Sequence, residues 1–212
     1  YSADDFIRIL LIQKLNIKTL IIGDDFRFAK NREGDYSRLE SVHEILNFKL
    51  KKISSVIHDN QRISSTLIRE YLHLGQLQNA KKLLGKPYQM SGRVVKGEQL
   101  GRDLGYPTAN ISLDGLHQPK LGIYSVLADI LTGPKAGSYK GVTSVGRKPM
   151  FGDNAVNCET YIFDFTGNIY GEQISVALVD FLRCEQKFSS IEQLITQMNM
   201  DCDKARLSLE II

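Results

Sequence analysis

Residues 96–111 read KGEQLGRDLGYPTANI, and the rest of the chain can be interpreted outward from this stretch. Three glycines recur in it at four-residue intervals: Gly97, Gly101 and Gly105. Glycine accepts positive φ and lets backbone N–H groups approach an anion. Arg102 adds a fixed cation, and Thr108 and Asn110 follow Pro107 with oxygens that a hard cation accepts. The stretch therefore predicts a phosphate loop ending in a rigid turn with a divalent cation beside it. A Gly-rich turn between two strands is the alternative.

The composition sets the class of protein. The chain has 212 residues, 42% of them apolar, which is enough for one large or two small cores. A net charge of +3 without a basic cluster does not call for a nucleic-acid partner. Three widely spaced cysteines without a C-x-x-C pair indicate reduced thiols and a cytoplasmic protein. No apolar run approaches the ~18 residues of a membrane span, so we expect no membrane partner. The first residue is not Met, and we expect a fragment whose front is missing.

The first part of the chain alternates helical and strand patterns. Helices are predicted over 4–15 and 39–47, and strands over 18–23 and 52–57. This alternation favours a doubly wound sheet, or the remaining half of one. Gly23, Asp25 and Phe26 come at the end of the first strand, where open α/β sheets bind ligands. A solvated loop is the alternative there.

A second anion-binding pattern opens the next predicted helix. It consists of Ser64, Ser65 and Thr66, with Arg69 one turn later. The free N–H groups and the dipole at a helix N-terminus can hold a phosphate, whereas plain N-capping is the alternative. Gly75 ends this helix, and a second helix over 76–84 ends at Gly85. We place the domain boundary there, between residues 86 and 87.

Beyond this boundary the pattern changes to short strands. Segments rich in Val, Ile, Tyr and Phe lie near 89–95, 122–131, 139–146, 157–164 and 172–182, separated by Gly, Pro, Asp and Asn turns. This spacing predicts a small antiparallel barrel. A helix follows, with Ser189 and Glu192 as its capping box and an apolar stripe that includes Ile191 and Ala205.

These residues resemble those of the bacterial bifunctional riboflavin kinase/FAD synthetases, over nearly the whole chain and without roughly the first third. GEQLGRDLGYPTANI resembles the ATP loop of the kinase module, and RISSTLIREYLHLGQLQNAKKLLGKPY the end of the adenylyltransferase module. The resemblance implies an α+β protein of two domains. Residues 1–86 would be part of a Rossmann-like α/β nucleotidyltransferase (FMN adenylyltransferase) domain. Residues 87–212 would be a riboflavin kinase domain, a small antiparallel β-barrel with a C-terminal helix.

The resemblance also implies roles for kinase residues. ATP binding falls to Gly97, Gly101, Arg102, Gly105, Thr108 and Asn110, and Mg2+ binding to Thr108 and Asn110. Glu159 matches the catalytic carboxylate of the family, and its chemistry agrees, because a carboxylate can take the proton of a weakly nucleophilic primary hydroxyl. The product would be FMN, from riboflavin phosphorylated at its ribityl 5'-hydroxyl with ATP as co-substrate.

Two further segments, VGRKPMFG (145–152) and LRCEQKF (182–188), resemble flavin-side elements of the family. They imply flavin contacts by Arg147, Met150, Phe151, Arg183, Glu185 and Phe188. Cys184 stands where the family usually has proline, and Lys148-Pro149-Met150 stands near a usual Arg-Pro-Thr. A surface ion pair is the structural alternative for Arg183.

The adenylyltransferase half lacks a central motif. The family relies on H-x-G-H, and none of the four histidines lies in such a pattern. Gly23, Asp25, Phe26, Ser64, Ser65, Thr66 and Arg69 would be remnants of a site for ATP and FMN that is complete only in the full-length protein, which would make FAD. We expect a monomer or weak homo-oligomer. A rival hypothesis is a non-catalytic barrel that binds flavin or single-stranded nucleic acid.

Overall fold

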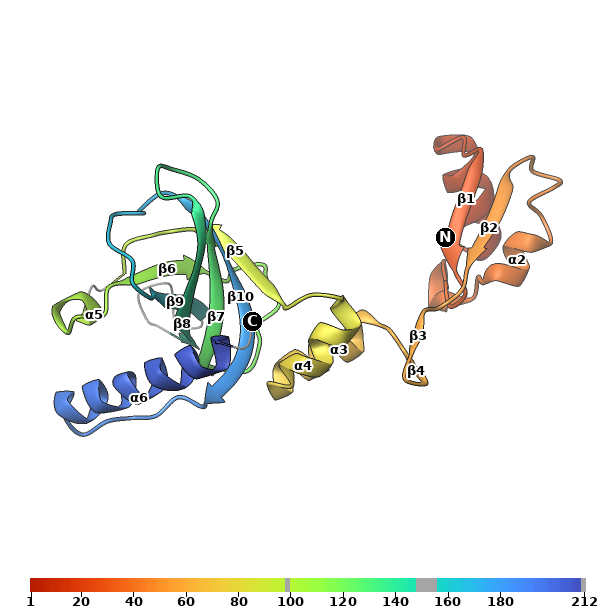
Figure 1. Ribbon diagram of the computed structural model, residues 1–212. Helices are drawn as coiled ribbons and strands as arrows, with labels where there is room; N and C mark the ends of the chain where they lie inside the picture. Colours follow the sequence, from red (N-terminus) through yellow and green to blue (C-terminus); the bar gives the residue numbers. More distant parts are fainter. Residues whose placement is uncertain (98–99, 148–155, 211–212) are drawn as a thin grey trace. The chain divides into compact units, whose positions relative to one another are not determined.

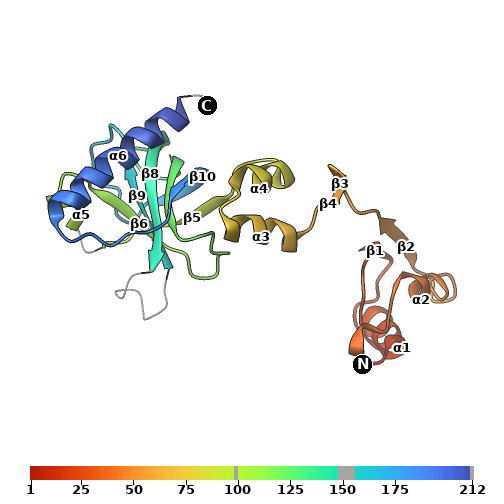
Figure 2. The ribbon, with the colours of Figure 1, turned by 90° about the horizontal axis from the view of Figure 1, so that it is seen from below.

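The computed structural model describes residues 1–97, 100–147 and 156–210. The chain divides into two compact units, Tyr1–Ile63 and Ser64–Ile212. Figure 1 labels the main elements of each unit, and Figure 2 also labels α1. Within the described ranges, no helix is both long enough and apolar enough to span a membrane.

The first unit is built on a two-stranded parallel sheet. Its elements are α1 (Ala3–Asp5), the π-helix η1 (Phe6–Lys14), β1 (Thr19–Gly23), the 3-10 helix η2 (Lys30–Arg32), α2 (Tyr36–Glu40), β2 (Lys49–Ile53), β3 (Ile57–His58) and β4 (Gln61–Arg62). β1 pairs with β2 and β3 with β4. Ala3, Ile7 and Leu11 recur every four residues and form one core with residues that include Phe28 and Leu39.

Three predicted elements of this unit differ in extent. The strand expected over 52–57 is β2, which starts at Lys49 and ends at Ile53. The helix expected over 39–47 is α2, which ends at Glu40 and starts at Tyr36 because the carboxylate of Asp35 accepts the N–H of Arg38 at 3.0 Å and caps it. The strand expected over 18–23 forms, but it is not buried throughout. Ile21 is 55% exposed, because β1 has β2 as its strand partner in a two-stranded sheet.

The second unit is an antiparallel barrel of six strands in the order β5-β10-β7-β8-β9-β6. The strands are β5 (Gln89–Arg93), β6 (Thr108–Ser112), β7 (Gly122–Ile130), β8 (Gly137–Arg147), β9 (Val156–Ile162) and β10 (Gln173–Arg183). Five of them match the predicted segments. The sixth, β6, lies where the sequence predicts the end of a phosphate loop and a turn. The barrel is nearly closed, since the N–H of Val95, two residues after β5, donates to the carbonyl of Asn110 in β6 at 2.9 Å.

Two helices precede the barrel and share its core. They are α3 (Ser65–Leu74) and α4 (Leu77–Leu84), and they end at Gly75 and Gly85, both in the left-handed region as predicted. Leu72, Leu77 and Ala80 are buried in one cluster with barrel residues such as Met90. The compact unit therefore begins before these helices. The module boundary between residues 86 and 87 stays a prediction.

The last helix, α6 (Ile191–Leu209), lies along the outside of the barrel (Figures 1 and 2). It is capped by Ser190, whose hydroxyl accepts the N–H of Gln193 at 3.3 Å, one residue later than predicted. Its C-terminal half is the buried half: Ala205 and Leu209 pack with barrel residues that include Phe163. Ile191, expected in the packed stripe, is 60% exposed.

Candidate active site

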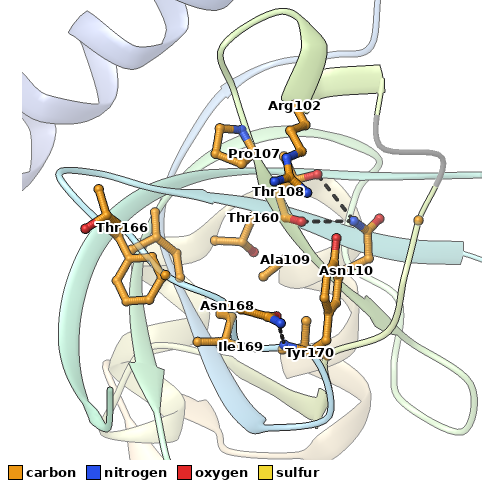
Figure 3. A pocket seen from close by; sticks show the side chains of 15 residues that line it. Arg102, Pro107, Thr108, Ala109, Asn110, Thr160, Thr166, Asn168, Ile169 and Tyr170 are labelled. Carbon is orange, nitrogen blue, oxygen red and sulfur yellow. Dashed lines mark hydrogen bonds between the residues drawn. The ribbon is translucent and has the colours of Figure 1, made fainter. Parts of the chain in front are cut away.

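A cavity of about 550 Å3 lies beside β6 in the barrel unit (Figure 3). One part of its wall consists of predicted ATP-binding residues: Gly97, Arg102, Thr108 and Asn110. Another part comes from β9 and the loop after it. It combines the apolar and aromatic side chains of Ile162, Phe165, Ile169 and Tyr170 with the polar ones of Thr160, Thr166 and Asn168. Gly101 and Gly105 do not line the cavity. The structure thus brings four of the six predicted ATP-binding residues to one cavity.

Each glycine of the loop is favoured at its position for a different structural reason. A Cβ on Gly97 would lie within 2.9 Å of the side chain of Asn110, and a Cβ on Gly101 would lie 2.5 Å from the carbonyl oxygen of Tyr106. Gly105 has φ +89°, which favours glycine. The turn that contains the short helix α5 (Leu100–Asp103) closes when the N–H of Tyr106 donates to the carbonyl of Gly101 at 2.7 Å. The four-residue spacing therefore folds this turn tightly beside β6.

A polar network joins β6 to β9. The side-chain amide of Asn110 donates to the hydroxyl and carbonyl oxygens of Thr108, each at 3.3 Å (Figure 3). The pairing of the two strands sets Asn110 opposite Glu159. Between them, the Nδ2 of Asn157 donates to Oδ1 of Asn110 at 3.3 Å and to Oε1 of Glu159 at 3.1 Å. The predicted metal ligands and the predicted catalytic carboxylate thus belong to one network.

Asn157 is a residue of this network that the sequence interpretation missed. Its side chain is buried, with 1% exposure. The available signal was its spacing, because residues i and i+2 of a strand share one face and Asn157 is two residues before Glu159. The cavity wall at residues 165–170 was also missed. Here the sequence Thr166-Gly167-Asn168 was interpreted as a turn, and Oδ1 of Asn168 accepts the N–H of Tyr170 at 3.0 Å.

The oxygens of this network suit a hard cation. Hydroxyl, amide and carboxylate oxygens are the ligands of Mg2+ in proteins, and Mg2+ usually completes its shell with water and substrate phosphates. In the described residues, no group of three or more His, Cys, Asp and Glu side chains could hold a metal ion. Thr108 and Asn110 offer a hydroxyl and an amide oxygen that a hard cation accepts, and their role as metal ligands stays a prediction.

Four of the six predicted flavin residues belong to the described parts of the chain, where they lie on two segments. Arg147 is exposed at the end of β8, whereas Met150 and Phe151 lie outside the described residues. The carboxylate of Glu185 occupies the space that a Cβ on Gly146 would fill, and Gly146 pairs with Asn157 across β8 and β9. Glu185 therefore reaches the strand end that carries the polar network.

Arg183 has a structural partner. Its Nε donates to both carboxylate oxygens of Asp201 at 2.9 Å, and its Nη2 donates to Oδ2 at 2.6 Å. The two side chains are 14% and 5% exposed, so the ion pair expected as the alternative to a flavin contact forms, but it is largely buried and not at the surface. The guanidinium carbon also lies 5.9 Å from the ring centre of Phe188. Flavin contacts by Arg183 and Phe188 stay predictions.

The predicted adenylyltransferase residues fall in both units. In the first, Gly23 ends β1, Phe26 stacks on Phe28 at 5.6 Å, and Asp25 pairs with Arg62 at 2.7 Å, which lowers the pKa of that carboxyl.

In the second unit, the hydroxyl of Ser64 accepts the N–H of Leu67 at 3.2 Å and caps α3. This is the N-capping role that the sequence offers as the alternative to phosphate binding. Arg69 donates to the hydroxyl of Ser65 at 3.2 Å, and Thr66 is exposed in the same first turn. Phosphate binding by these residues stays a prediction.

Comparison with known proteins agrees with this geometry. A family model described as riboflavin kinase matches residues 84–209, and one described as FAD synthetase matches residues 1–67. Relatives named bifunctional riboflavin kinase/FMN adenylyltransferase occur in Haemophilus influenzae (39% identity, 96% of this chain and 65% of the relative) and Buchnera aphidicola subsp. Schizaphis graminum (40%, 100% and 68%). The Escherichia coli K12 relative is 36% identical over 94% of this chain and 63% of its own length.

A solved structure described as a macrolide-efflux protein from Streptococcus pneumoniae is also similar, with a TM-score of 0.74 and 33% identity over 94% of this chain and 63% of that one. The chain spans about two thirds of the length of the curated relatives it matches. The family models and the relatives agree along its length, and the chain belongs to the bifunctional riboflavin kinase/FMN adenylyltransferase family.

Proposed function

We propose that the barrel unit phosphorylates riboflavin at its ribityl 5'-hydroxyl, with ATP as the donor. The hydroxyl oxygen attacks the γ-phosphorus, the bond from that phosphorus to the β,γ-bridging oxygen breaks, and ADP leaves. The proton of the hydroxyl passes to a carboxylate. The products are FMN and ADP. This assignment is supported by the relatives' printed names and by a cavity that holds predicted phosphate-loop residues together with apolar side chains.

Each part of the cavity has a role in this reaction. The apolar residues Ile162, Phe165 and Ile169 suit the base of a nucleotide, and Arg102 at the same cavity suits its phosphates. Thr108 and Asn110 would hold Mg2+, which neutralises developing charge on the transferred phosphoryl group. Most catalysis in phosphoryl transfer is positioning and charge neutralisation. Thr108 and Asn110 lie on the paired strand β6, and Arg102 lies in the short helix α5.

The observation that carries the proposal is the polar network on β6 and β9. Glu159 lies opposite Asn110 in the strand pairing, so a carboxylate is adjacent to the proposed metal ligands. A protein that only binds flavin has no need for this combination. In the proposed reaction Glu159 takes the proton of the attacking hydroxyl as a general base.

For the first unit we propose a part in the second reaction of the family. Gly23, Asp25 and Phe26 would belong to a site for ATP and FMN in the longer protein. For Ser64–Thr66 and Arg69, which lie in the second unit, we propose phosphate binding. Because the chain spans about two thirds of its relatives and contains no H-x-G-H motif, we expect this chain to make FMN without FAD. The partners would be riboflavin, FMN and ATP, with no nucleic acid. We propose a monomer or weak homo-oligomer.

Turnover of riboflavin with MgATP, with the flavins separated by chromatography, tests the proposal. We expect FMN from the wild-type chain, and a loss of about 10²- to 10⁴-fold in kcat for Glu159→Gln, since general-base catalysis contributes this range. Glu70→Gln, an exposed change on α3, is the matched control. Folded wild-type chain that yields no FMN would refute the kinase. Full activity of Glu159→Gln would refute its role as the base.

A further inference from the structure

The helix α6 contacts both proposed substrate-side segments within three residues of its length. We propose that residues 199–201 of α6 are a common anchor, in which Asn199 positions the Gly-rich loop through Tyr106 and Asp201 positions segment 183–188 through Arg183. The functional part of this inference rests on the kinase proposal. The structural part does not.

On the nucleotide side the link is a single hydrogen bond across a long sequence separation. The hydroxyl of Tyr106 donates to Oδ1 of Asn199 at 2.6 Å. The ring of Tyr106 also packs edge-on against Tyr161 of β9, with ring centres 5.2 Å apart. The hydroxyl of Tyr106 carries its proton at neutral pH, as tyrosine ordinarily does, and partial burial raises its pKa. Tyr106 therefore fixes the end of the loop to α6 and to the barrel.

The same residue closes the loop through its backbone. Its N–H donates to the carbonyl of Gly101, and two further turn bonds run from Leu104 to Gly101 at 3.2 Å and from Gly105 to Arg102 at 3.1 Å. Thr108, the first residue of β6, follows Tyr106 by two positions. A shift of Tyr106 would therefore move both the turn that carries Arg102 and the start of the strand that carries the proposed metal ligands.

On the flavin side the link is the buried ion pair. Asp201 is two residues after Asn199 and accepts hydrogen bonds from Arg183. It is also held from its own helix, because Nε2 of Gln197 donates to it at 2.9 Å. Arg183 in turn donates through Nη1 to the carbonyl of Cys184 at 2.9 Å, which orients the backbone where segment 183–188 begins.

The anchor itself is fixed independently of the two segments. Ala205 and Leu209, in the turns that follow Asp201, have no solvent exposure and pack in the cluster that contains Val142 and Phe163. Lys140 on β8 also donates to the carbonyl of Leu209 at 2.6 Å. α6 can therefore hold the loop in place, because the helix is held to the barrel at its other end.

Amide hydrogen exchange tests the anchor without any ligand. In Tyr106→Phe, which keeps the ring packing, the amides of residues 104–106 should exchange about fivefold faster, the equivalent of one hydrogen bond of ~1 kcal/mol. Asn199→Ala should have the same effect, and the double variant should add nothing further. Tyr139→Phe is the control, since its hydroxyl donates at 3.0 Å to the carbonyl of Lys135, a contact that involves neither the loop nor α6. Unchanged exchange in Tyr106→Phe, or an equal rise in the control, would overturn the anchor.

Steady-state kinetics test the positioning role. We expect Tyr106→Phe to raise the KM for ATP about fivefold, with a smaller fall in kcat because the start of β6 shifts with the turn, and with the KM for riboflavin near wild type. Faster exchange with an unchanged KM for ATP would overturn the role in positioning. If the wild-type chain makes no FMN, the kinase proposal fails, and the exchange experiment still decides whether the anchor exists.

Discussion

Replacing Asn157 with alanine should affect both the stability and the activity of the barrel unit. The side chain is buried and donates to Asn110 and to the carboxylate of Glu159. A neutral hydrogen bond contributes about 0.5–1.5 kcal/mol and one to a charged group about 1.5–3 kcal/mol. Loss of both therefore predicts a destabilisation of ~3 kcal/mol. For a unit of this size, that corresponds to a fall of about 6–12 °C in Tm.

Activity should fall as well, because the donor fixes the positions of a proposed metal ligand and of the proposed base at once. A displacement near 1 Å at a catalytic group costs about 10²-fold, so we expect kcat to fall about 10- to 100-fold. Thermal melts and riboflavin turnover measure the two effects. Asn79→Ala is the matched control, an exposed asparagine whose side chain donates to Gln76 at 3.2 Å. An Asn157→Ala chain that melts and turns over like this control would refute the network as a positioning device.

Three further outcomes follow from the structure. Gly97→Ala should raise the KM for ATP about tenfold, because the added Cβ meets the side chain of Asn110; an unchanged KM would contradict this contact. Cys184 is exposed and should react with a thiol reagent in the native protein. Cys158, fully buried with its pKa raised by burial, should react only on unfolding, and mass mapping of early products checks the order. Asp201→Asn should cost about 3 kcal/mol in urea unfolding, since it leaves a largely buried guanidinium without its carboxylate; a stability equal to wild type would show that the ion pair is dispensable.

Local signals identified most of the barrel unit. Five strands are rich in β-branched and aromatic residues and are bounded by turn residues, and Gly75 and Gly85 end α3 and α4 in the left-handed conformation that glycine favours. These features depend on a few neighbouring residues. The sequence alone was therefore sufficient for them.

Features were predicted less well where two adjacent residues fit the same sequence pattern. Ser189 and Glu192 fit the capping-box spacing, and so do Ser190 and Gln193 one residue later. The structure uses the second pair at α6. The side-chain oxygen of Gln193 accepts the N–H of Ser189 at 3.4 Å, so the neighbouring serine also takes part. The apolar pattern could not show that α6 packs through its C-terminal half, because this depends on where the barrel surface ends.

The missed strand β6 explains why the chemistry of the site was understood only in part. Thr108 and Asn110 follow a proline and a run of glycines, which indicates a turn, and the partner strand β9 comes about 50 residues later in the pairing of Asn110 with Glu159. In a turn, two residues at i and i+2 need not face the same way. In a strand they must, and a paired strand puts its partner's residues on that face too. The strand conformation thus brings Thr108, Asn110, Asn157 and Glu159 into one network, and a loop of identical sequence would not do so. The residue types of the site can be identified from the sequence, but their convergence depends on a strand pairing that no local pattern contains.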